Sequence, residues 1–537
     1  MLVNDFLQNS AERLPDKVAL ICNGHRLTYA KVEEQANRVA NGLLALGVQR
    51  GERVAVWLPN SVEAVVAIFA ILKAGATFTV INPTTKAGKL AYVLNNCGAS
   101  GLFAAGRQGG KGTQLFESVP SLRFAVLCGK RTQAPHAVGG SVTAHPQAPH
   151  PNVMAFPDLL GTSPPTRPPC HTIDVDLACL IYTSGSTGEP KGVMSTHANV
   201  VFAASSIIQY LENTPEDIVI NVLPLSFDYG LYQLLMTFKF GGTLVLEQSF
   251  TYPAVVLRRI EQERVTGFPG VPTLFAVLLQ MDLSPFDLSS LRYLTNTAAA
   301  LPVEHIRRLR EAFSWARLYS MYGLTECKRT LYLPPEELDR RPGSVGIAIP
   351  GTEAWVEDED GRRLDPAEVG ELVVRGSHVM QGYWGDAEQT ARRYRPGRYP
   401  AERLLYTGDL FRMDEEGFLY FVARKDDIIK SRGEKVAPKE VESVIYQVPG
   451  VVQVAVVGVP DELLGQAIKA FVVCSNGHPL TEQEILHHCA QHLEDFMLPR
   501  YVEFRSSLPK TGSGKIQKSA LAGCHSEGSE ESRYRQP

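Results

Sequence analysis

The sequence predicts an α/β protein: a large N-terminal domain of mostly parallel sheets with a β-rich subdomain, and a small, mobile C-terminal α+β domain. Short strand-like runs, such as 53–58 (RVAVWL) and 77–82 (TFTVIN), alternate with helical segments such as 303–313 (VEHIRRLREAF). This alternation is typical of parallel sheets covered by helices. From about 340 to 423 the pattern is β-rich, and a shorter α/β pattern begins after Arg424.

The chain of 537 residues is too long for one hydrophobic core and predicts at least two domains. We expect a large domain at 1–423, a hinge at 424–427 (RKDD) and a small domain at 428–523. The polar end, 524–537, is expected to be disordered. Residues 131–170 are rich in proline, alanine and histidine and lack periodicity, so we expect a loose surface loop there.

The composition excludes several classes of function. Hydrophobic residues make up 44% and charged residues 20%, as in ordinary globular proteins, and a net charge of −4 gives no basic surface for nucleic acid. The longest apolar run, 64–72 (AVVAIFAIL), is too short to span a bilayer and predicts a buried helix. The N-terminus lacks the pattern of a secretory signal, and the nine cysteines are scattered without a CxxC pair. We therefore expect a cytoplasmic protein with free thiols and no integral membrane segment.

A segment rich in small residues, 181–192 (IYTSGSTGEPKG), follows an apolar strand-like run. Its glycines let the backbone approach a ligand closely, and successive N–H groups can bind an anion. Hydroxyl groups and the positive charge of Lys191 complete a site suited to polyphosphate. The order Lys191-Gly192-Val193 is not that of a Walker A loop, in which serine or threonine follows the lysine. A P-loop nucleotidase is therefore disfavoured.

The run YTSGSTGEPKG closely resembles the signature loop of the AMP-forming, adenylate-forming superfamily, which includes acyl-CoA synthetases, carrier-protein-loading adenylation domains and luciferases. Other family motifs follow in the same order: MYGLTE (321–326), GELVVRG and QGYW (within 370–384), YTGDL (406–410), ARKDDIIKSRGEKVAPKEVE (423–442) and LPKTGSGKIQK (508–518). The resemblance covers nearly the whole chain. It implies that a carboxylate attacks the α-phosphorus of ATP to give acyl-AMP and pyrophosphate, and that a thiol then displaces AMP. Such phosphoryl chemistry depends mainly on positioning and charge neutralisation.

The resemblance also implies which residues bind the nucleotide. The residues around the phosphates would be Thr183, Ser184, Gly185, Ser186, Thr187, Gly188 and Lys191. The residues at the adenine would be Tyr322, which stacks on the base, and Ala298, Ala299 and Ala300 beside it. Asp409 would accept hydrogen bonds from both ribose hydroxyls, with Arg424 assisting.

By the same resemblance the catalytic residues would be Lys515, Thr325, Glu326 and Lys191. Thr325 would bond to the α-phosphate, and Glu326 would hold Mg²⁺, a cation that favours carboxylate and phosphate oxygens. Lys515 would bridge the substrate carboxylate and the ribose and α-phosphate oxygens, an effect of about 10²–10³ in rate. Asp426 would be the hinge about which the small domain turns after adenylation, and Gly433 would line the thiol tunnel.

The acid pocket is expected to include Phe227, Asp228, Tyr232 and Met321. Phe227 stands where related acyl- and aryl-CoA ligases commonly carry histidine. Asp228 falls where amino-acid-activating domains carry the aspartate that pairs with the substrate ammonium, a pairing that a buried carboxylate needs. Alternatively, Asp228 caps a helix starting at Tyr229. Tyr229, Tyr232 and Met321 would narrow the pocket and favour small or medium acids over long chains.

Lys328 and Arg329 follow Thr325-Glu326-Cys327 directly. Two cations beside the acyl pocket could recognise a second carboxylate or a phosphate on the substrate. The expectation that we favour is ordinary: at least one of them faces solvent or pairs with acids such as Glu336 and Glu337.

These observations favour an ATP- and Mg²⁺-dependent acid–thiol ligase, with CoA as the thiol because 430–435 (KSRGEK) is basic enough to meet its phosphates. The alternative is a stand-alone amino-acid adenylation enzyme that loads the phosphopantetheine arm of a carrier protein. A regulatory nucleotide-binding protein without catalysis is disfavoured, because Lys191, Glu326, Asp409 and Lys515 are all present. A luciferase-like oxygenase would rest on fold analogy alone.

Overall fold

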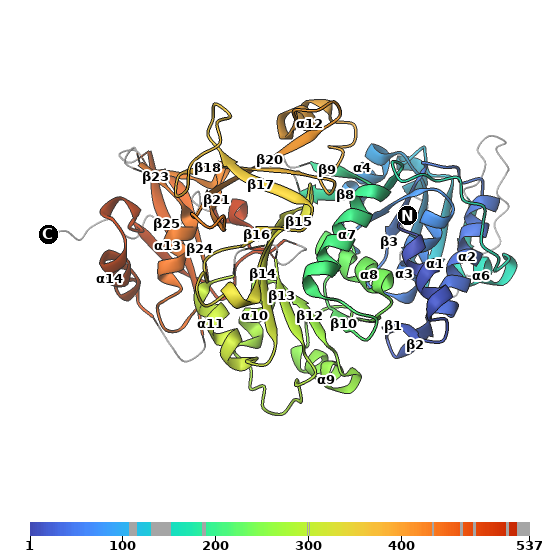
Figure 1. Ribbon diagram of the computed structural model, residues 1–537, viewed down its shortest axis with the longest axis horizontal. Helices are drawn as coiled ribbons and strands as arrows, with labels where there is room; N and C mark the ends of the chain where they lie inside the picture. The colour runs from blue at the N-terminus through green and yellow to red at the C-terminus, as the bar shows by residue number, and fades with distance from the viewer. Residues whose placement is uncertain are drawn as a thin grey trace, which may run out of the picture.

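The computed structural model describes residues 1–106, 115–129, 152–184, 189–297, 299, 301–431, 434–461, 465–475, 480–511 and 515–522. These residues form four β-sheets and the helices packed against them (Figure 1). The mixed α/β architecture with mostly parallel sheets in the N-terminal part confirms the fold class predicted from the alternation of strand-like and helical runs.

The largest sheet has nine strands in the order β16-β15-β14-β13-β12-β10-β11-β1-β2. Its strands are β1 (Val18–Cys22), β2 (His25–Thr28), β10 (Ile218–Asn221), β11 (Thr243–Leu246), β12 (Gly267–Gly270), β13 (Tyr293–Asn296), β14 (Arg317–Leu324), β15 (Lys328–Leu333) and β16 (Ile347–Ala348). Neighbours from β14 to β1 are parallel, and β2, β15 and β16 add antiparallel edges.

A second sheet has seven strands in the order β7-β6-β5-β3-β4-β8-β9. They are β3 (Arg53–Trp57), β4 (Thr77–Val80), β5 (Ala99–Ala105), β6 (Phe124–Cys128), β7 (Asn152–Ala155), β8 (Leu177–Ser184) and β9 (Pro190–Thr196). All neighbours are parallel except β8 and β9, which form an antiparallel hairpin.

The helices of the N-terminal part cover both large sheets, and most of them share one hydrophobic core with the sheets, whereas α4 packs in a second, smaller core. They are α1 (Asp5–Arg13), α2 (Tyr29–Ala45), α3 (Val62–Lys73), α4 (Ala87–Cys97), α6 (Phe156–Thr162), α7 (His197–Leu211), α8 (Asp228–Phe240), α9 (Pro253–Glu263), α10 (Pro272–Leu278) and α11 (Val303–Ala312). Residues 64–72 are buried within α3, as their apolar run predicts. Across the described ranges, no helix combines the length and apolar character needed to cross a membrane.

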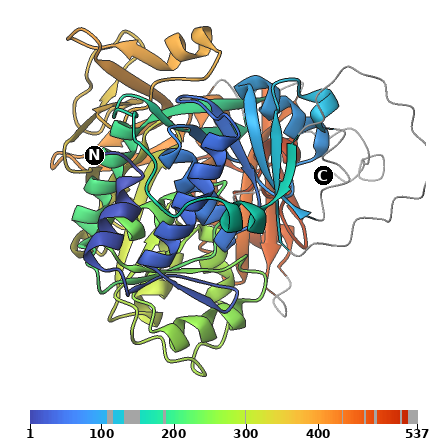
Figure 2. The same ribbon diagram turned by 90° about the vertical axis from the view of Figure 1, so that its right-hand side faces the viewer.

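The β-rich part is a five-stranded antiparallel sheet with its own core. It consists of β17 (Thr352–Glu357), β18 (Val369–Gly376), β19 (Tyr394–Pro396), β20 (Arg403–Met413) and β21 (Leu419–Arg424), with helix α12 (Ala387–Arg393). In the view of Figure 2 the segment around α12, in orange, stands at the top of the molecule.

The C-terminal sheet runs β23-β22-β25-β24, with β26 paired to β25, and lies at the left of Figure 1. Its strands are β22 (Ile429–Ser431), β23 (Glu434–Val436), β24 (Val451–Asp461), β25 (Gly465–Cys474) and β26 (Tyr501–Phe504). The helices here are α13 (Pro438–Ile445), α14 (Glu482–His492) and α15 (Lys518–Ala522). Short 3-10 turns lie at Pro335–Glu337, Lys425–Asp427 and Asp495–Met497.

The expectation of a structureless loop over 131–170 is wrong for its second half. Asn152–Ala155 forms β7 beside β6, and α6 follows directly. Phe156 and Leu159 are buried, and the Asp158 carboxylate accepts the Ala155 N–H at 3.3 Å. Two buried apolar side chains and one capping carboxylate are thus enough to order a proline-rich segment. Residues 130–151 and the predicted disordered end, 524–537, lie outside the described residues.

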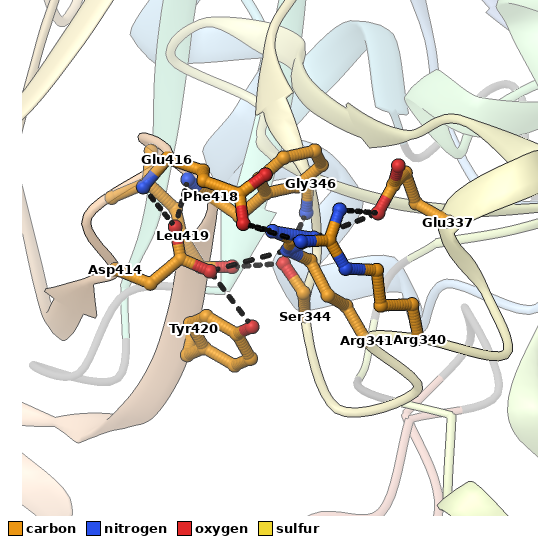
Figure 3. Close-up of polar contacts among 10 residues, drawn as sticks. All are labelled: Glu337, Arg340, Arg341, Ser344, Gly346, Asp414, Glu416, Phe418, Leu419 and Tyr420. Carbon is orange, nitrogen blue, oxygen red and sulfur yellow. Dashed lines mark hydrogen bonds and ion pairs between the residues drawn. The ribbon is translucent and has the colours of Figure 1, made fainter.

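A buried arginine joins the edge of the largest sheet to the β-rich part (Figure 3). Arg341 follows β15, and its side chain is only 6% exposed. Its guanidinium pairs with Glu337 at 2.7 Å, and across the junction with Asp414 at 3.2 Å and Glu416 at 2.5 Å. It also lies 4.0 Å from the centre of the Phe418 ring. These contacts hold the β20–β21 turn against the segment that follows β15.

Candidate active site

The strands β10, β12, β13 and β14 are parallel neighbours, so their carboxyl ends meet at one edge of the largest sheet. Ligands of α/β proteins bind at such edges. The segments that leave these strands begin at residues 222, 271, 297 and 325. They carry Phe227 and Asp228 of the expected acid pocket, the described part of the adenine segment, and Thr325 and Glu326, which the topology therefore brings together.

Tyr322 and Asp409 connect two sheets at this edge. The Tyr322 hydroxyl, at the end of β14, donates to Oδ2 of Asp409 on β20 at 2.7 Å. Asp409 is 4% exposed, and burial raises the pKa of its carboxyl, an effect that Arg424 and Tyr322 oppose. Arg424 lies opposite Asp409 on β21, with its Nε 3.7 Å from Oδ1. The Asp409 carboxylate thus contacts Tyr322 on β14 and Arg424 on β21.

Gly408 determines how Asp409 is presented. Its φ is +70°, a left-handed conformation that glycine adopts without strain. Its N–H donates to the Glu371 carboxylate at 2.7 Å, and a side chain here would collide with the guanidinium of Arg393. The glycine of the YTGDL motif is therefore required by backbone geometry.

The small-residue segment is a hairpin between β8 and β9. Thr183 lies opposite Lys191, and Ser184 lies opposite Pro190. The strand expected before the motif is confirmed. The predicted phosphate-binding residues Gly185, Ser186, Thr187 and Gly188 lie outside the described residues.

Lys191, Tyr383 and Glu326 form a chain of contacts between the hairpin and the MYGLTE motif. The Lys191 Nζ lies 5.8 Å from the centre of the Tyr383 ring, and the Tyr383 hydroxyl donates to Oε1 of Glu326 at 2.6 Å. Burial raises the pKa of Tyr383, so the phenol stays a donor. The backbone N–H of Trp384 also donates to the Gly192 carbonyl at 2.8 Å. The hairpin is thereby fixed to the QGYW segment.

Thr325 and Glu326 occupy the tight turn between β14 and β15. The Glu326 carbonyl accepts from the Met380 N–H at 2.9 Å, and the Thr325 carbonyl accepts from the Lys328 ammonium at 3.1 Å. A Cβ on Gly323 would collide with the Lys328 carbonyl oxygen, so this glycine lets the two strands approach. Both backbone carbonyls of the turn are therefore hydrogen-bonded, and the side chains of Thr325 and Glu326 are half-buried.

Lys515 comes from the C-terminal part and reaches the same site. A turn places it, because the Thr511 N–H bonds to the Lys515 carbonyl at 2.8 Å and the Lys515 N–H to the Thr511 hydroxyl at 3.2 Å. Burial and then Arg424 lower the pKa of its ammonium, and Asp228, Asp409 and Glu326 oppose this. The lysine is therefore within electrostatic range of three carboxylates from three separate motifs.

The adenine segment is only partly described. The Asn296 side-chain amide, at the end of β13, donates to the Ala299 carbonyl at 3.2 Å and so positions that turn. Ala299 is exposed. Ala298 and Ala300 lie outside the described residues.

The expected acid-pocket residues surround the start of α8. Helix α8 begins at Asp228, one residue before the predicted start, with Phe227 at its N-cap and no side-chain capping bond. The Asp228 carboxylate accepts the Tyr229 N–H at 3.0 Å within the first turn. Phe227 packs edge-to-face on Tyr229, at 6.3 Å between ring centres. Tyr232 is buried one turn later. The sulfur of the buried Met321 accepts the Tyr210 hydroxyl at 2.9 Å, which directs it into the core.

The expectation that Lys328 or Arg329 faces solvent or pairs with acids such as Glu336 and Glu337 is wrong. Neither faces solvent, since the two residues are 3% and 4% exposed, and Glu337 pairs with Arg340 and Arg341 instead. The reason is that their side chains lie against α8, beside the rings of Tyr229 and Tyr232.

Asp426 lies in the 3-10 turn Lys425–Asp427, which joins β21 to β22. These two strands belong to different sheets, and the Lys425 ammonium is tied to Glu371 of β18 at 3.0 Å. Asp426 itself is exposed. Gly433 lies outside the described residues.

Three residues of the site were missed by sequence reasoning: Tyr383, Glu371 and Arg393. Arg393, on α12, interacts electrostatically with Tyr383, Glu326 and Asp409. The first two lie in the QGYW and GELVVRG motifs, which signalled that the segments matter but not which side chain does. Nothing in the sequence around Arg393 sets it apart from the neighbouring arginines.

The fold and the site together define an ATP-dependent ligase that activates a carboxylic acid as acyl-AMP for transfer to a thiol. The family model described as "AMP-binding enzyme" matches residues 7–384, and the model "AMP-binding enzyme C-terminal domain" matches residues 440–515. The chain belongs to the AMP-binding enzyme family.

Several characterised relatives match along nearly their whole length. A long-chain-fatty-acid–CoA ligase of Bacillus subtilis is 32% identical over 97% of this chain and 94% of its own. A feruloyl-CoA synthase of Amycolatopsis is 34% identical over 95% of this chain and 96% of its own. Among solved structures, an anthranilate CoA ligase in complex with anthranoyl-AMP has a TM-score of 0.87 and 28% identity, over 97% of this chain and 96% of its own.

Proposed function

We propose that this protein adenylates a carboxylic acid with ATP and transfers the acyl group to CoA. The observation that carries the proposal is the meeting of the MYGLTE, YTGDL and QGYW motifs, where Tyr322 bonds to Asp409 at 2.7 Å and Tyr383 bonds to Glu326 at 2.6 Å. Lys515 lies near enough that the charges of Asp409, Glu326 and Asp228 affect its pKa. Charged groups from separate segments of the chain need a common reason to meet at the edge of a sheet. A site that neutralises ATP and a carboxylate gives them one.

In the first step an oxygen of the substrate carboxylate attacks the α-phosphorus of ATP, and pyrophosphate leaves. Both partners are anionic, so charge compensation dominates the barrier. Lys515 supplies a cation between them, and the Thr325 hydroxyl donates to the α-phosphate. Lys191, held over Tyr383, faces the departing pyrophosphate.

Glu326 fits a role in holding Mg²⁺. The described residues contain no cluster of three metal-ligating side chains, but Mg²⁺ at a nucleotide needs only one or two carboxylates besides the phosphates and waters. The Glu326 carboxylate has one oxygen fixed by Tyr383. When bound, the cation would neutralise phosphate charge.

The second step transfers the acyl group from AMP to a thiol sulfur. We propose that the boundary between domains 1–423 and 428–523 lies at the turn around Asp426, which joins strands of two different sheets. Rotation there would withdraw Lys515 once adenylation is complete. CoA is favoured as acceptor because the relatives are named as CoA ligases. They give no support to a carrier protein.

The alternative, an amino acid as substrate, rests on Asp228. Its half-buried carboxylate has one described hydrogen bond, from Tyr229 N–H, and could face an ammonium. The cytoplasm is the proposed location, because the eight cysteines within the described ranges are all free and seven of those lie at least partly buried.

The test is formation of acyl-CoA from ATP, CoA and a panel of acids and amino acids, followed by mass spectrometry. The proposal predicts AMP release that requires both an acid and CoA. Release with a phosphopantetheinylated carrier protein but not with CoA, and only with amino acids, would establish the alternative. In that case Asp228→Asn should remove the activity.

A further inference from the structure

Three side chains near the proposed acid site form a buried group of hydrogen-bond donors: Lys328, Arg329 and Tyr232, here called the donor cluster. Each residue is at most 4% exposed. Lys328 and Arg329 begin β15, and Tyr232 projects from α8. The Tyr232 ring lies 5.6 Å from the Lys328 ammonium and 5.8 Å from the Arg329 guanidinium, so the three form one group.

The donor cluster contains no acceptor that matches its charge. Within the described residues, neither cation has an acidic partner within 4 Å, and Glu337 pairs with Arg340 and Arg341 instead. The Lys328 ammonium donates to the Thr325 carbonyl at 3.1 Å, and the one acceptor of the Arg329 guanidinium among the described residues is the Met236 sulfur at 3.6 Å. The Tyr232 hydroxyl has no hydrogen-bond partner there.

Burial without a counter-ion is costly for cations. The tyrosine rings offset part of this cost, since Arg329 also lies 4.9 Å from the centre of the Tyr229 ring. Cation–π contacts leave most guanidinium N–H groups without an acceptor, however, because an aromatic ring stacks on the flat face of the guanidinium while its N–H groups point outward in the plane. An arginine has five such donors in a fork that matches a carboxylate.

The donor cluster adjoins the proposed acid site. Lys328 is two residues beyond Glu326, and its ammonium is bonded to the Thr325 carbonyl. Tyr232 is one helical turn, about 6 Å, beyond Asp228 on the same helix. Asp228, whose charge raises the pKa of Lys515, is the one acidic side chain at the start of α8. The donor cluster thus contains two cations and no carboxylate of its own.

We propose that the acid activated by this protein carries a second carboxylate, and that Arg329, Lys328 and Tyr232 bind it while the first carboxylate is adenylated. The inference rests on the proposed function and narrows its substrate class to dicarboxylic acids. Arg329 supplies a bidentate fork, Lys328 a point charge and Tyr232 a neutral donor. The span of about one helical turn favours short or medium diacids over long chains.

The test is acid-dependent pyrophosphate exchange with matched pairs of equal carbon number: succinate and butyrate, adipate and hexanoate, suberate and octanoate. The monomethyl ester of each diacid keeps its length without its second charge. The wild-type protein should prefer the diacid over both analogues by at least about tenfold in kcat/KM in at least one pair, since unpaired charged donors discriminate strongly.

Arg329→Met should abolish or reverse that preference through KM for the acid, with kcat for the monoacid retained. Methionine fills a similar volume and removes a buried charge, so the variant should fold. Tyr232→Phe should reduce the preference by a smaller factor. Arg317→Met is the matched control, because that arginine is half exposed and pairs with Glu212 on the surface.

A wild-type preference for the monoacid in every pair, unchanged in Arg329→Met, would overturn the inference and leave the proposed function intact. Failure of every acid to support exchange would instead contradict the proposed function and the inference with it.

Discussion

The hydroxyl of Tyr322 is bonded to the carboxylate of Asp409 at 2.7 Å, and this contact joins the largest parallel sheet to the antiparallel β-rich sheet. The two residues are 87 positions apart in the chain. Their contact means that the proposed adenosine site is built from both sheets and does not belong to either one. Phe411 packs edge-to-face on the same tyrosine ring at 4.9 Å, which fixes its orientation.

Tyr322→Phe should raise the KM for ATP by about two- to tenfold, with a smaller effect on kcat. The ring remains to stack on adenine, but Asp409 loses one hydrogen bond that orients its carboxylate, a contribution of about 1 kcal/mol. Steady-state exchange kinetics at varied ATP measure this. An Asp409→Asn variant should have the larger defect. If Tyr322→Phe changed kcat alone, the contact would not serve nucleotide binding.

Tyr383→Phe should lower adenylation about tenfold or more and raise the Mg²⁺ concentration needed for half-maximal rate. The lost bond is charge-assisted, because the phenol donates to the Glu326 carboxylate at 2.6 Å. Tyr394→Phe is the matched control. Its ring packs on Tyr383, and its hydroxyl has no hydrogen-bond partner among the described residues. Equal defects in both variants would assign the effect to packing.

The rate of adenylation should fall as the pH rises through the pKa of Lys515, at a pH below the ordinary lysine value of 10.5. Burial lowers this pKa, and only the protonated amine supplies the cation that the step requires. The measurement is the pH profile of kcat/KM for exchange between pH 7 and 10.5. Lys515→Arg should retain its residual activity at the alkaline end, because arginine stays charged. An alkaline limb unchanged in that variant would belong to another group.

Three buried histidines should make the protein acid-sensitive. Burial lowers the pKa of His197, His305 and His378 from 6.5 to about 4. The unfolded chain therefore binds more protons than the folded one below pH 6.5, so stability is complete above that pH and is lost as the pH falls towards 4. At pH 5, which is 1.5 units below the unfolded pKa of 6.5, each histidine lowers the free energy of unfolding by about 2 kcal/mol.

Urea unfolding at pH 7.5 and pH 5 measures the effect. His378 lies between the hydroxyls of Thr330 and Thr352, at 3.1 and 3.3 Å. His378→Gln should therefore cost some stability at pH 7.5 and show a smaller further loss at pH 5. A midpoint that shifts with pH equally in this variant and in the wild type would exclude His378 from the effect.

The order of the motifs predicts much of this fold and of the location of the site. The strand runs at 53–58 and 77–82 coincide with β3 and β4 to within two residues. They could be read because a strand buried on both faces is a continuous apolar run. Local sequence is less informative at 152–162, where order depends on β6 and the core beside it.

In the site, too, some residues could be predicted from local sequence and others depend on tertiary neighbours. Lys191, Glu326, Asp409 and Lys515 could be chosen from their motifs, because each stands in a distinctive local sequence. The burial of Lys328 and Arg329 could not, since it depends on the Tyr229 and Tyr232 rings of α8, a helix far away in the sequence. Side chains whose role depends on a tertiary neighbour leave no local pattern, and Arg393 is another example.

The central claim is that Lys515 supplies the cation for transfer of a carboxylate onto the α-phosphorus of ATP. Its most direct test is carboxylate-dependent exchange of labelled pyrophosphate into ATP, which requires no thiol. The account predicts exchange by the wild-type protein with at least one acid, and a loss of about 10²–10³-fold in Lys515→Ala at unchanged ATP binding. Exchange that is undiminished in Lys515→Ala, or that proceeds equally well without any acid, would contradict it.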